Sequence, residues 1–259
     1  MKRSWIGLGL APLMVACPQG DGAQPPPEAP PAVAVQVAGG AAQAPGAYRS
    51  DWRAVPEGEP PGEFRDVRRD GHRQSWLYDG GWRITHRTGS PVLEVPFALR
   101  EPREPLSFQR YVGSAFGPDG ALPVRYRIEA EARSLGESAR FRGYGELAIQ
   151  ALYLSPVSYV EVLQTDEHLF IWEARNAPPM QGQGWKALAK GPHSAKVGQW
   201  LTFGAEVDRE RGTIRALLDG RVVAEAKSRL ITPEAEARFT LRATGNREEW
   251  RWVRVDALP

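Results

Sequence analysis

The sequence predicts an all-β protein, built as a two-layer sandwich of antiparallel strands. From about Asp51 to the C-terminus, apolar and polar residues alternate with a period of two, the pattern of strands with one buried and one solvated face. No segment shows a convincing helical period longer than about two turns. The hydrophobic content of 42% and the charged content of 25% are those of an ordinary globular protein.

The individual strands follow from this alternation and from the turns between them. The pattern is clearest over 125–133, where charged and apolar residues alternate for nine positions. The clearest hairpin lies within 213–223, because Asp219-Gly220 supplies the pair of residues with positive φ that a tight turn requires. In 146–154 the alternation places Leu147, Ile149, Ala151 and Tyr153 on one face. Further strands are predicted at 82–85, 107–112, 200–207, 238–243 and 249–256, and two more within 159–174.

The first seventeen residues predict export and anchoring. Lys2 and Arg3 precede an uncharged, mostly apolar run over 5–16, which is far shorter than the roughly 20 residues needed to span a bilayer. This is the pattern of a secretory signal peptide over 1–16. Cys17, the only cysteine, follows at the cleavage point and resembles the lipobox of bacterial lipoproteins, in which that cysteine is lipidated. The resemblance implies a lipid anchor in the bacterial cell envelope, at the outer membrane or the periplasmic face of the inner membrane.

The next segment predicts a disordered tether, so that 17–48 forms the lipidated cysteine and its linker and 49–259 the sandwich domain. Residues 18–48 include seven Pro, nine Ala and five Gly, with Asp21 and Glu28 as the only charges. This composition buries too little apolar area to offset the chain entropy. Such a chain would reach about 30 Å as a coil and up to about 95 Å in a polyproline-like form. The run 33–37 could instead pair as a short strand.

Charge and cysteine content exclude several classes of protein. Processing removes Lys2 and Arg3 and leaves 31 basic residues against 31 acidic ones, so the mature chain has no electrostatic reason to bind nucleic acid. A single cysteine allows no internal disulfide, so core burial must hold the domain together. No stretch after the signal peptide is apolar enough to predict a second membrane segment.

Several strand and turn motifs resemble those of concanavalin A-like jelly-roll domains, over about 51–258. They are the segments Asp79–Ile84, Tyr159–Leu163, Gly198–Val207, Ile214–Val223 and Trp252–Val255. The resemblance implies a two-sheet antiparallel jelly-roll sandwich. That superfamily includes laminin-G-like modules, bacterial glycan-binding domains, and a branch of keto-disaccharide and other glycoside hydrolases. The shared motifs are mostly structural, so they indicate the fold more specifically than the activity.

No arrangement of residues predicts a catalytic or metal site. Glucanases of the superfamily need two suitably spaced carboxylates, and the nearest match is Glu129 and Glu131 on one strand face. Arg125, Arg127 and Arg133 share that face, so it is interpreted as charge-balanced, solvated surface. No Gly-x-Ser-x-Gly elbow predicts a nucleophilic serine, and the histidines lack close ligand spacing. These are His72, His86, His168 and His193. No cofactor is predicted, although calcium stays open at Asp166-Glu167, at Asp208 with Glu210, and at Asp219.

The segment 159–174 carries the best candidate binding face. If Asp166-Glu167 forms the turn, the aliphatic residues of both strands point to the core. The opposite face then carries Tyr159, Glu161, Phe170 and Trp172. Aromatic planes beside a carboxylate suit a sugar, whose C–H face stacks on a ring while its hydroxyls form hydrogen bonds. Gln150 and Glu146 would lie beside this face, and Gln181, Gln183 and Trp185 of the following loop could complete it. Alternatively, Phe170 and Trp172 pack beneath the loop 176–184.

Three hypotheses follow. The first is a non-enzymatic module that binds a glycan or cell-wall polysaccharide through Tyr159, Glu161, Trp172, Gln150 and Trp185. The second is a glycoside hydrolase of the keto-disaccharide hydrolase-like type, with acids from separate strands such as Glu161 and Glu173. The third is a structural envelope lipoprotein without a small ligand.

Overall fold

The computed structural model describes most of the domain that the sequence predicts. The described residues are 48–59, 61, 64–66, 82–86, 89–95, 115–118, 122–136, 146–155, 157–176, 184–236, 238–244 and 247–259. They belong to one compact unit, 41–259. The predicted signal peptide, Cys17, nearly all of the tether and the predicted strand 107–112 lie outside these residues. In the described ranges every regular element is a strand, and no helix could cross a bilayer.

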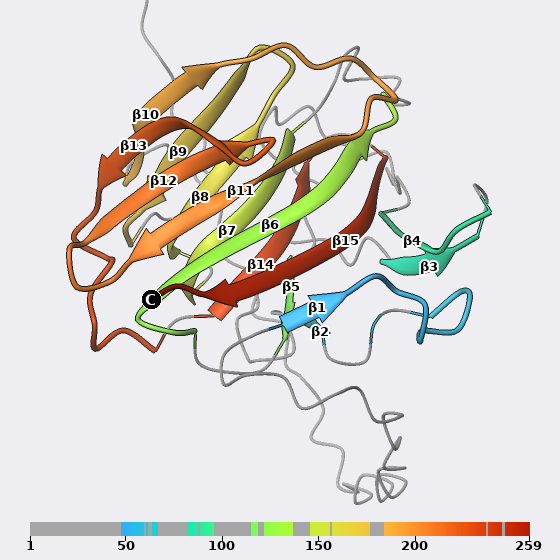
Figure 1. Cartoon of the computed structure of the whole chain (residues 1–259), viewed down its shortest axis with the longest axis horizontal. Coiled ribbons are helices and arrows are strands. Elements are labelled where there is room, and N and C mark those ends of the chain that lie inside the picture. Colours follow the sequence, from blue (N-terminus) through green and yellow to red (C-terminus); the bar gives the residue numbers. More distant parts are fainter. Residues whose placement is uncertain are drawn as a thin grey trace, which may run out of the picture. The chain divides into compact units, whose positions relative to one another are not determined.

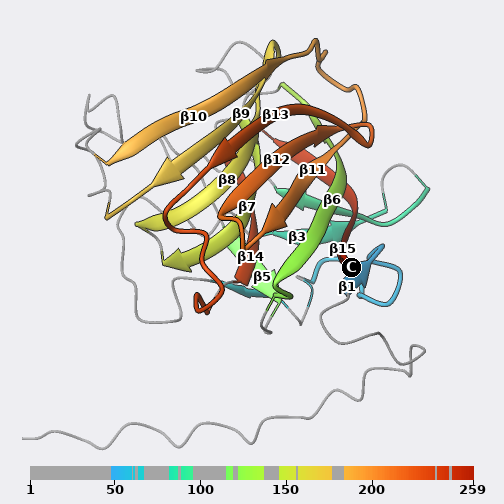
Figure 2. The same cartoon turned by 60° about the vertical axis from the view of Figure 1, so that its left-hand side comes forward.

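The strands form two antiparallel sheets (Figures 1 and 2). One sheet has the order β13 (Arg221–Lys227), β12 (Thr213–Leu218), β11 (Leu201–Asp208), β6 (Arg125–Ser134), β15 (Glu248–Ala257), β4 (Val92–Val95) and β3 (Arg83–Thr85), and β1 (Tyr48–Ser50) also pairs with β15. The other has the order β10 (Trp185–Pro192), β9 (His168–Ala174), β8 (Ser158–Gln164), β7 (Glu146–Ser155), β14 (Arg238–Thr244), β5 (Ala115–Pro118) and β2 (Phe64–Asp66).

The connections between the sheets are nested. The chain passes from β6 in the eight-stranded sheet to β7 in the seven-stranded sheet, and it returns from β14 to β15. Because β7 pairs with β14 and β6 pairs with β15, the crossing strands lie beside one another in both layers. This arrangement gives a jelly-roll sandwich and confirms the predicted fold class.

The core lies between the inner faces of the two sheets. Its members include Ile128 of β6, Val162 of β8, Ile171 of β9, Phe203 of β11 and Trp250 of β15, all fully buried. Each occupies one phase of its strand's alternation, which is why period-two patterning located the strands correctly. A core of this size holds the domain without a disulfide.

Most of the predicted strands are present within two residues of their predicted ends, and the hairpin at 213–223 is confirmed. Asp219 and Gly220 have φ of 48° and 74°, as a tight turn between twisted strands requires. Five of the described strands were not predicted: β1, β2, β4, β5 and β10. The sequence of β10 shows little alternation of apolar and polar residues. β1 begins at Tyr48, the last residue of the predicted tether.

One prediction about strand faces is wrong. The sequence pattern placed Tyr153 on the same face as Leu147 and Ile149. In the structure, Ile149 pairs with Val162 but Leu152 pairs with Val160, so β7 contains a bulge between them. The extra residue shifts the alternation, and Tyr153 pairs with Tyr159 on the face that points away from the core.

Candidate functional site

The outer face of the seven-stranded sheet brings the predicted binding residues together. Glu161 of β8 pairs with Trp172 of β9, and paired residues share a face. The ring of Tyr159 meets the ring of Trp185 of β10 edge-on, with 5.9 Å between the ring centroids. The ring of Phe170 lies 6.0 Å from that of Trp172. As the alternation predicted, the aliphatic residues of this hairpin point the other way: Val160, Val162, Leu169 and Ile171 all belong to the core.

A buried ion pair, which sequence reasoning missed, fixes the carboxylate of this face. Arg242 of β14 donates from Nε to Glu161 Oε2 at 3.0 Å and from Nη2 to Oε1 at 2.8 Å. The side chains of Arg242 and Glu161 are only 6% and 1% exposed. Glu146 Oε2 lies 3.8 Å from Arg242 Nη1 on the other side of the guanidinium. Arg242 therefore bridges two carboxylates, and its planar group fixes the position of Glu161.

Burial and charge shift the titration of this cluster. Burial raises the pKa of Tyr159 well above its ordinary value, and the negative charge of Glu161 raises it further. Burial also raises the pKa of Glu146, and Glu161 adds to the increase while Arg242 opposes it. For Arg242 burial lowers the pKa, but Glu161, Tyr159 and Glu146 outweigh burial, so the net direction is upward. Arg242 therefore stays charged at any pH at which the protein is folded.

Of the other polar groups on this face, one pair is hydrogen-bonded and two buried atoms have no partner among the described residues. The Thr240 hydroxyl of β14 donates a hydrogen bond to the Gln150 side-chain oxygen, and both residues are buried. The Tyr159 hydroxyl and the Trp172 indole N–H are buried atoms with no hydrogen-bond partner among the described residues. Unsatisfied buried polar atoms are costly in a folded protein, so these two groups are exceptions among the buried polar atoms of this face.

The predicted hydrolytic pair Glu161 and Glu173 is not brought together. Glu173 pairs with the core residue Val160, so it lies on the opposite face of the sheet from Glu161. Its carboxylate accepts hydrogen bonds from the Ser228 hydroxyl and from Arg175 Nη2, the latter at 2.6 Å. This correction follows from strand geometry, since odd and even positions of neighbouring strands point to opposite faces. The loop residues Gln181 and Gln183 lie outside the described residues.

The Glu129 and Glu131 face of β6 is charge-balanced, as predicted, but it is less solvated than expected. Glu129 is 3% exposed, and its Oε2 accepts a hydrogen bond from Arg254 Nη2 at 2.6 Å. Glu131 accepts hydrogen bonds from Arg251 Nη1 to both oxygens at 2.8 Å. Arginines of the neighbouring β15 cover both carboxylates because the two strands are paired along their length. Both carboxylates are therefore engaged by ion pairs with β15.

The candidate calcium ligands do not converge. Asp166 and Glu167 lie in the turn between β8 and β9, as predicted. Asp208 is engaged by Arg125 Nε at 3.3 Å and by Arg211 Nε at 3.6 Å. Among the residues that the structure describes, no group of three or more His, Cys, Asp or Glu side chains could hold a metal ion.

Comparisons with known proteins find similar architectures at low identity. The carbohydrate recognition domain of Emp47p is 13% identical, with a TM-score of 0.47 over 77% of this chain and 99% of that one. SCLam, a non-specific endo-β-1,3(4)-glucanase of family GH16, is 13% identical, with a TM-score of 0.48 over 83% of this chain and 92% of that one. The carbohydrate-binding module CBM66 from Bacillus subtilis is 13% identical, with a TM-score of 0.42 over 53% of this chain and 78% of that one.

No protein-family profile and no curated protein sequence matches the chain. The structural similarities are too distant to bear on function, because one fold hosts many activities. The function must therefore be argued from the residues of the site.

Proposed function

We propose that this protein is a non-enzymatic glycan-binding module, and that the outer face of its seven-stranded sheet is the binding site. The observation that supports the proposal is the arrangement of Tyr159, Trp172 and Trp185 around Glu161, whose carboxylate Arg242 holds in place. Sugar-binding sites combine flat apolar surface with a few fixed polar groups. This face has both, on adjacent strands rather than on loops.

The chemistry of binding follows from these groups. The half-buried rings of Phe170 and Trp172 offer a surface on which the C–H face of a sugar stacks. Glu161 is only 1% exposed and both of its oxygens accept hydrogen bonds from Arg242, so the carboxylate that a sugar hydroxyl can reach here is the 36% exposed Glu146, on the other side of the guanidinium.

Glycan binding by a Trp172→Ala variant tests the proposal. Isothermal titration with the glycan identified on an array should show affinity weaker by about tenfold or more, because a stacked aromatic is lost. Trp200→Ala is the matched control, since Trp200 is a half-buried tryptophan directly before β11 of the opposite sheet and the variant should bind normally. Undiminished binding by Trp172→Ala, or equal loss in both variants, would contradict this site.

One observation supports glycoside hydrolysis as a second candidate function. Glu146 has a raised pKa and shares Arg242 with Glu161, and a glycosidase needs one protonated and one ionised carboxyl group. Against it, both oxygens of Glu161 already accept hydrogen bonds from Arg242. Turnover of ordinary or oxidised disaccharides, abolished by Glu146→Gln or Glu161→Gln, would establish hydrolysis. If no substrate of a broad panel is turned over, glycan binding remains as the function. If no glycan binds either, a structural role in the envelope remains.

We also propose that the module is a lipoprotein, anchored through lipidated Cys17 and carried on the tether 18–48. The support is the sequence pattern of 1–17. Mass spectrometry of the mature N-terminus in a bacterial host should find a diacylated or triacylated cysteine. The Cys17→Ala variant should be absent from the washed membrane fraction. An intact N-terminus with an unmodified thiol would contradict the proposal.

A further inference from the structure

A pocket opens on the other sheet, at a gap along one edge of β15. β6 pairs with one edge of β15 over its whole length. On the other edge, β4 pairs with 248–250 and β1 pairs with 253–255. Among the described strands, none pairs with Arg251 and Trp252 on that edge. At one end of this gap the Trp52 indole N–H donates to the Trp250 carbonyl at 2.7 Å, so the interruption of the ladder is confined to Arg251 and Trp252.

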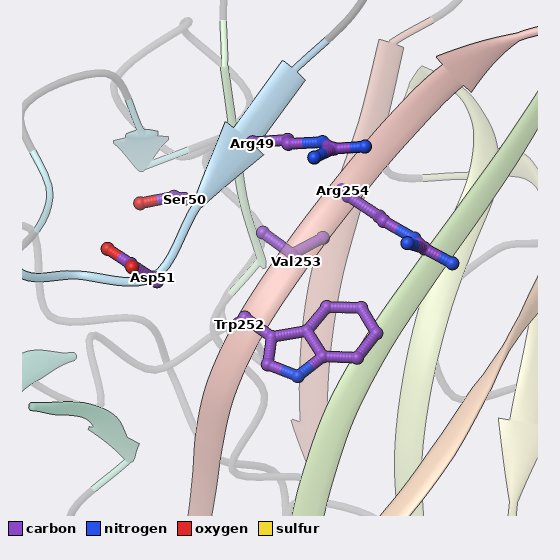
Figure 3. A pocket seen from close by; sticks show the side chains of 6 residues that line it. All are labelled: Arg49, Ser50, Asp51, Trp252, Val253 and Arg254. Carbon is purple, nitrogen blue, oxygen red and sulfur yellow. The ribbon is translucent and has the colours of Figure 1, made fainter. Parts of the chain in front are cut away.

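The pocket has a volume of about 380 Å³, in the range of small-molecule sites. Six residues line it: Arg49, Ser50, Asp51, Trp252, Val253 and Arg254 (Figure 3). A volume of this size accommodates one or two sugar rings rather than a large cofactor. The pocket is built from β1 and β15, on the sheet opposite to the one that carries Trp172.

Trp252 provides a fixed aromatic plane in this pocket. A bulge in β15 shifts the register between Trp250 and Trp252, so Trp250 enters the core while Trp252 pairs with Glu131 on the outer face. The Trp252 indole N–H donates to Glu131 Oε2 at 3.1 Å, which fixes the orientation of the ring. The Arg254 guanidinium carbon lies 5.5 Å from the ring centroid, within cation–π range.

Arg49 and Arg254 lie on neighbouring strands beside the pocket and supply hydrogen-bond donors. Arg49 of β1 pairs directly with Arg254 of β15, an arrangement that is unfavourable for like charges. Asp256 lies between them, 3.5 Å from Arg49 Nη2 and 3.6 Å from Arg254 Nε. Arg49 is 69% exposed, and this long contact with Asp256 is its only ion pair among the described residues. Most of its N–H groups are therefore available to a ligand.

The charges around the pocket balance, which decides the class of ligand. The positive groups are Arg49, Arg53, Arg251 and Arg254, and the negative groups are Asp51, Asp256, Glu129 and Glu131. A balanced set produces no net field to attract an anion. What remains is an aromatic plane with donors and acceptors at its rim, which matches an uncharged ring that carries hydroxyl groups.

We propose that this pocket is a second carbohydrate site, which binds a ring of a neutral saccharide against Trp252 with hydroxyls hydrogen-bonded to Arg49 and Arg254. The site does not depend on the one around Trp172, because the two lie on different sheets. Two sites on one module bind a polysaccharide, or two neighbouring chains, with an avidity that neither site has separately.

Two-dimensional NMR of the tryptophan indole N–H signals tests the site, in the Trp172→Ala variant so that the first site is disabled. Maltose, cellobiose, lactose and chitobiose are the neutral probes, with a glucuronate disaccharide as the acidic one. Trp252→Phe, which keeps an aromatic ring, identifies the Trp252 signal. We expect that signal to shift saturably with at least one neutral probe, at a Kd of about 1 mM.

Two variants of exposed arginines give the test its control. Arg49→Ala should weaken the response about threefold, because a donor is lost from the pocket. Arg53→Ala should leave the response unchanged, because the 80% exposed Arg53 side chain pairs with Asp51 and does not line the pocket. Three results would overturn the proposal: no Trp252 shift with any neutral probe, an equal response of both arginine variants, or tighter binding of the glucuronate.

Discussion

Removal of the positive charge of Arg242 should strongly destabilise the domain. Arg242→Met keeps the length of the side chain but leaves Glu161, which is 1% exposed, without the two hydrogen bonds of 2.8 and 3.0 Å that it accepts. Breaking a buried ion pair by removing one partner costs about 3–5 kcal/mol, because the other charge stays buried. The loss is large beside the about 5–15 kcal/mol that hold a typical domain folded.

The double variant Arg242→Met/Glu161→Leu should recover most of this loss. It removes both charges, and a buried pair replaced by apolar side chains is often neutral within about 1 kcal/mol. The free energies of unfolding come from urea denaturation at about pH 7, followed by tryptophan fluorescence, with the wild type, both single variants and the double variant in one cycle. The coupling energy between the two positions should exceed about 2 kcal/mol.

Arg215→Met is the matched control for this cycle. Arg215 also forms an ion pair between neighbouring strands, with Glu225 at 2.9 Å, but the side chains are 48% and 51% exposed. An ion pair this exposed is screened by solvent and contributes little, so this variant should unfold nearly as the wild type does. A loss below about 1 kcal/mol for Arg242→Met, or a double variant less stable than either single one, would refute the reasoning.

Three further predictions concern other parts of the domain. Gly204→Ala should cost about 3 kcal/mol in urea denaturation, because the new Cβ would lie 2.1 Å from the Ile128 carbonyl oxygen, and an unchanged midpoint would contradict it. Burial lowers the pKa of His193 below the ordinary 6.5, so its contribution to stability is full above about pH 6.5 and is lost as the pH falls through the folded pKa. His193→Gln should therefore flatten the pH dependence of Tm between about pH 7 and 5, and an unaltered profile would count against this. Trp200→Ala should cost about 1 kcal/mol or more, because Arg251 and Arg133 stack on its ring at 4.0 and 4.5 Å, and thermal unfolding measures the loss.

Much of the fold was predictable, because strand patterning is a local property. The alternation of 125–133 reports one buried face whatever the partners of that strand are, and it corresponds to β6. Asp219-Gly220 carries its turn in two residues, since positive φ is a property of the residues themselves. The shared face of Glu161 and Trp172 followed from two adjacent alternations and one short turn between them. The lipid anchor and the tether stay predictions.

The long-range features were decided only by the tertiary structure. Arg242 lies 81 residues from Glu161, and Arg49 meets Arg254 only because β1 pairs with the last strand. The bulges that turn Tyr153 and Trp252 to the outer faces leave no clear mark in the alternation. Period-two patterning states which face of a strand is buried, but not which strand lies beside it or where a register shifts. For this protein the sequence determined the sandwich and the face that Glu161 shares with Trp172, whereas sheet order and register determined which charges meet on that face and where the pocket beside Trp252 opens.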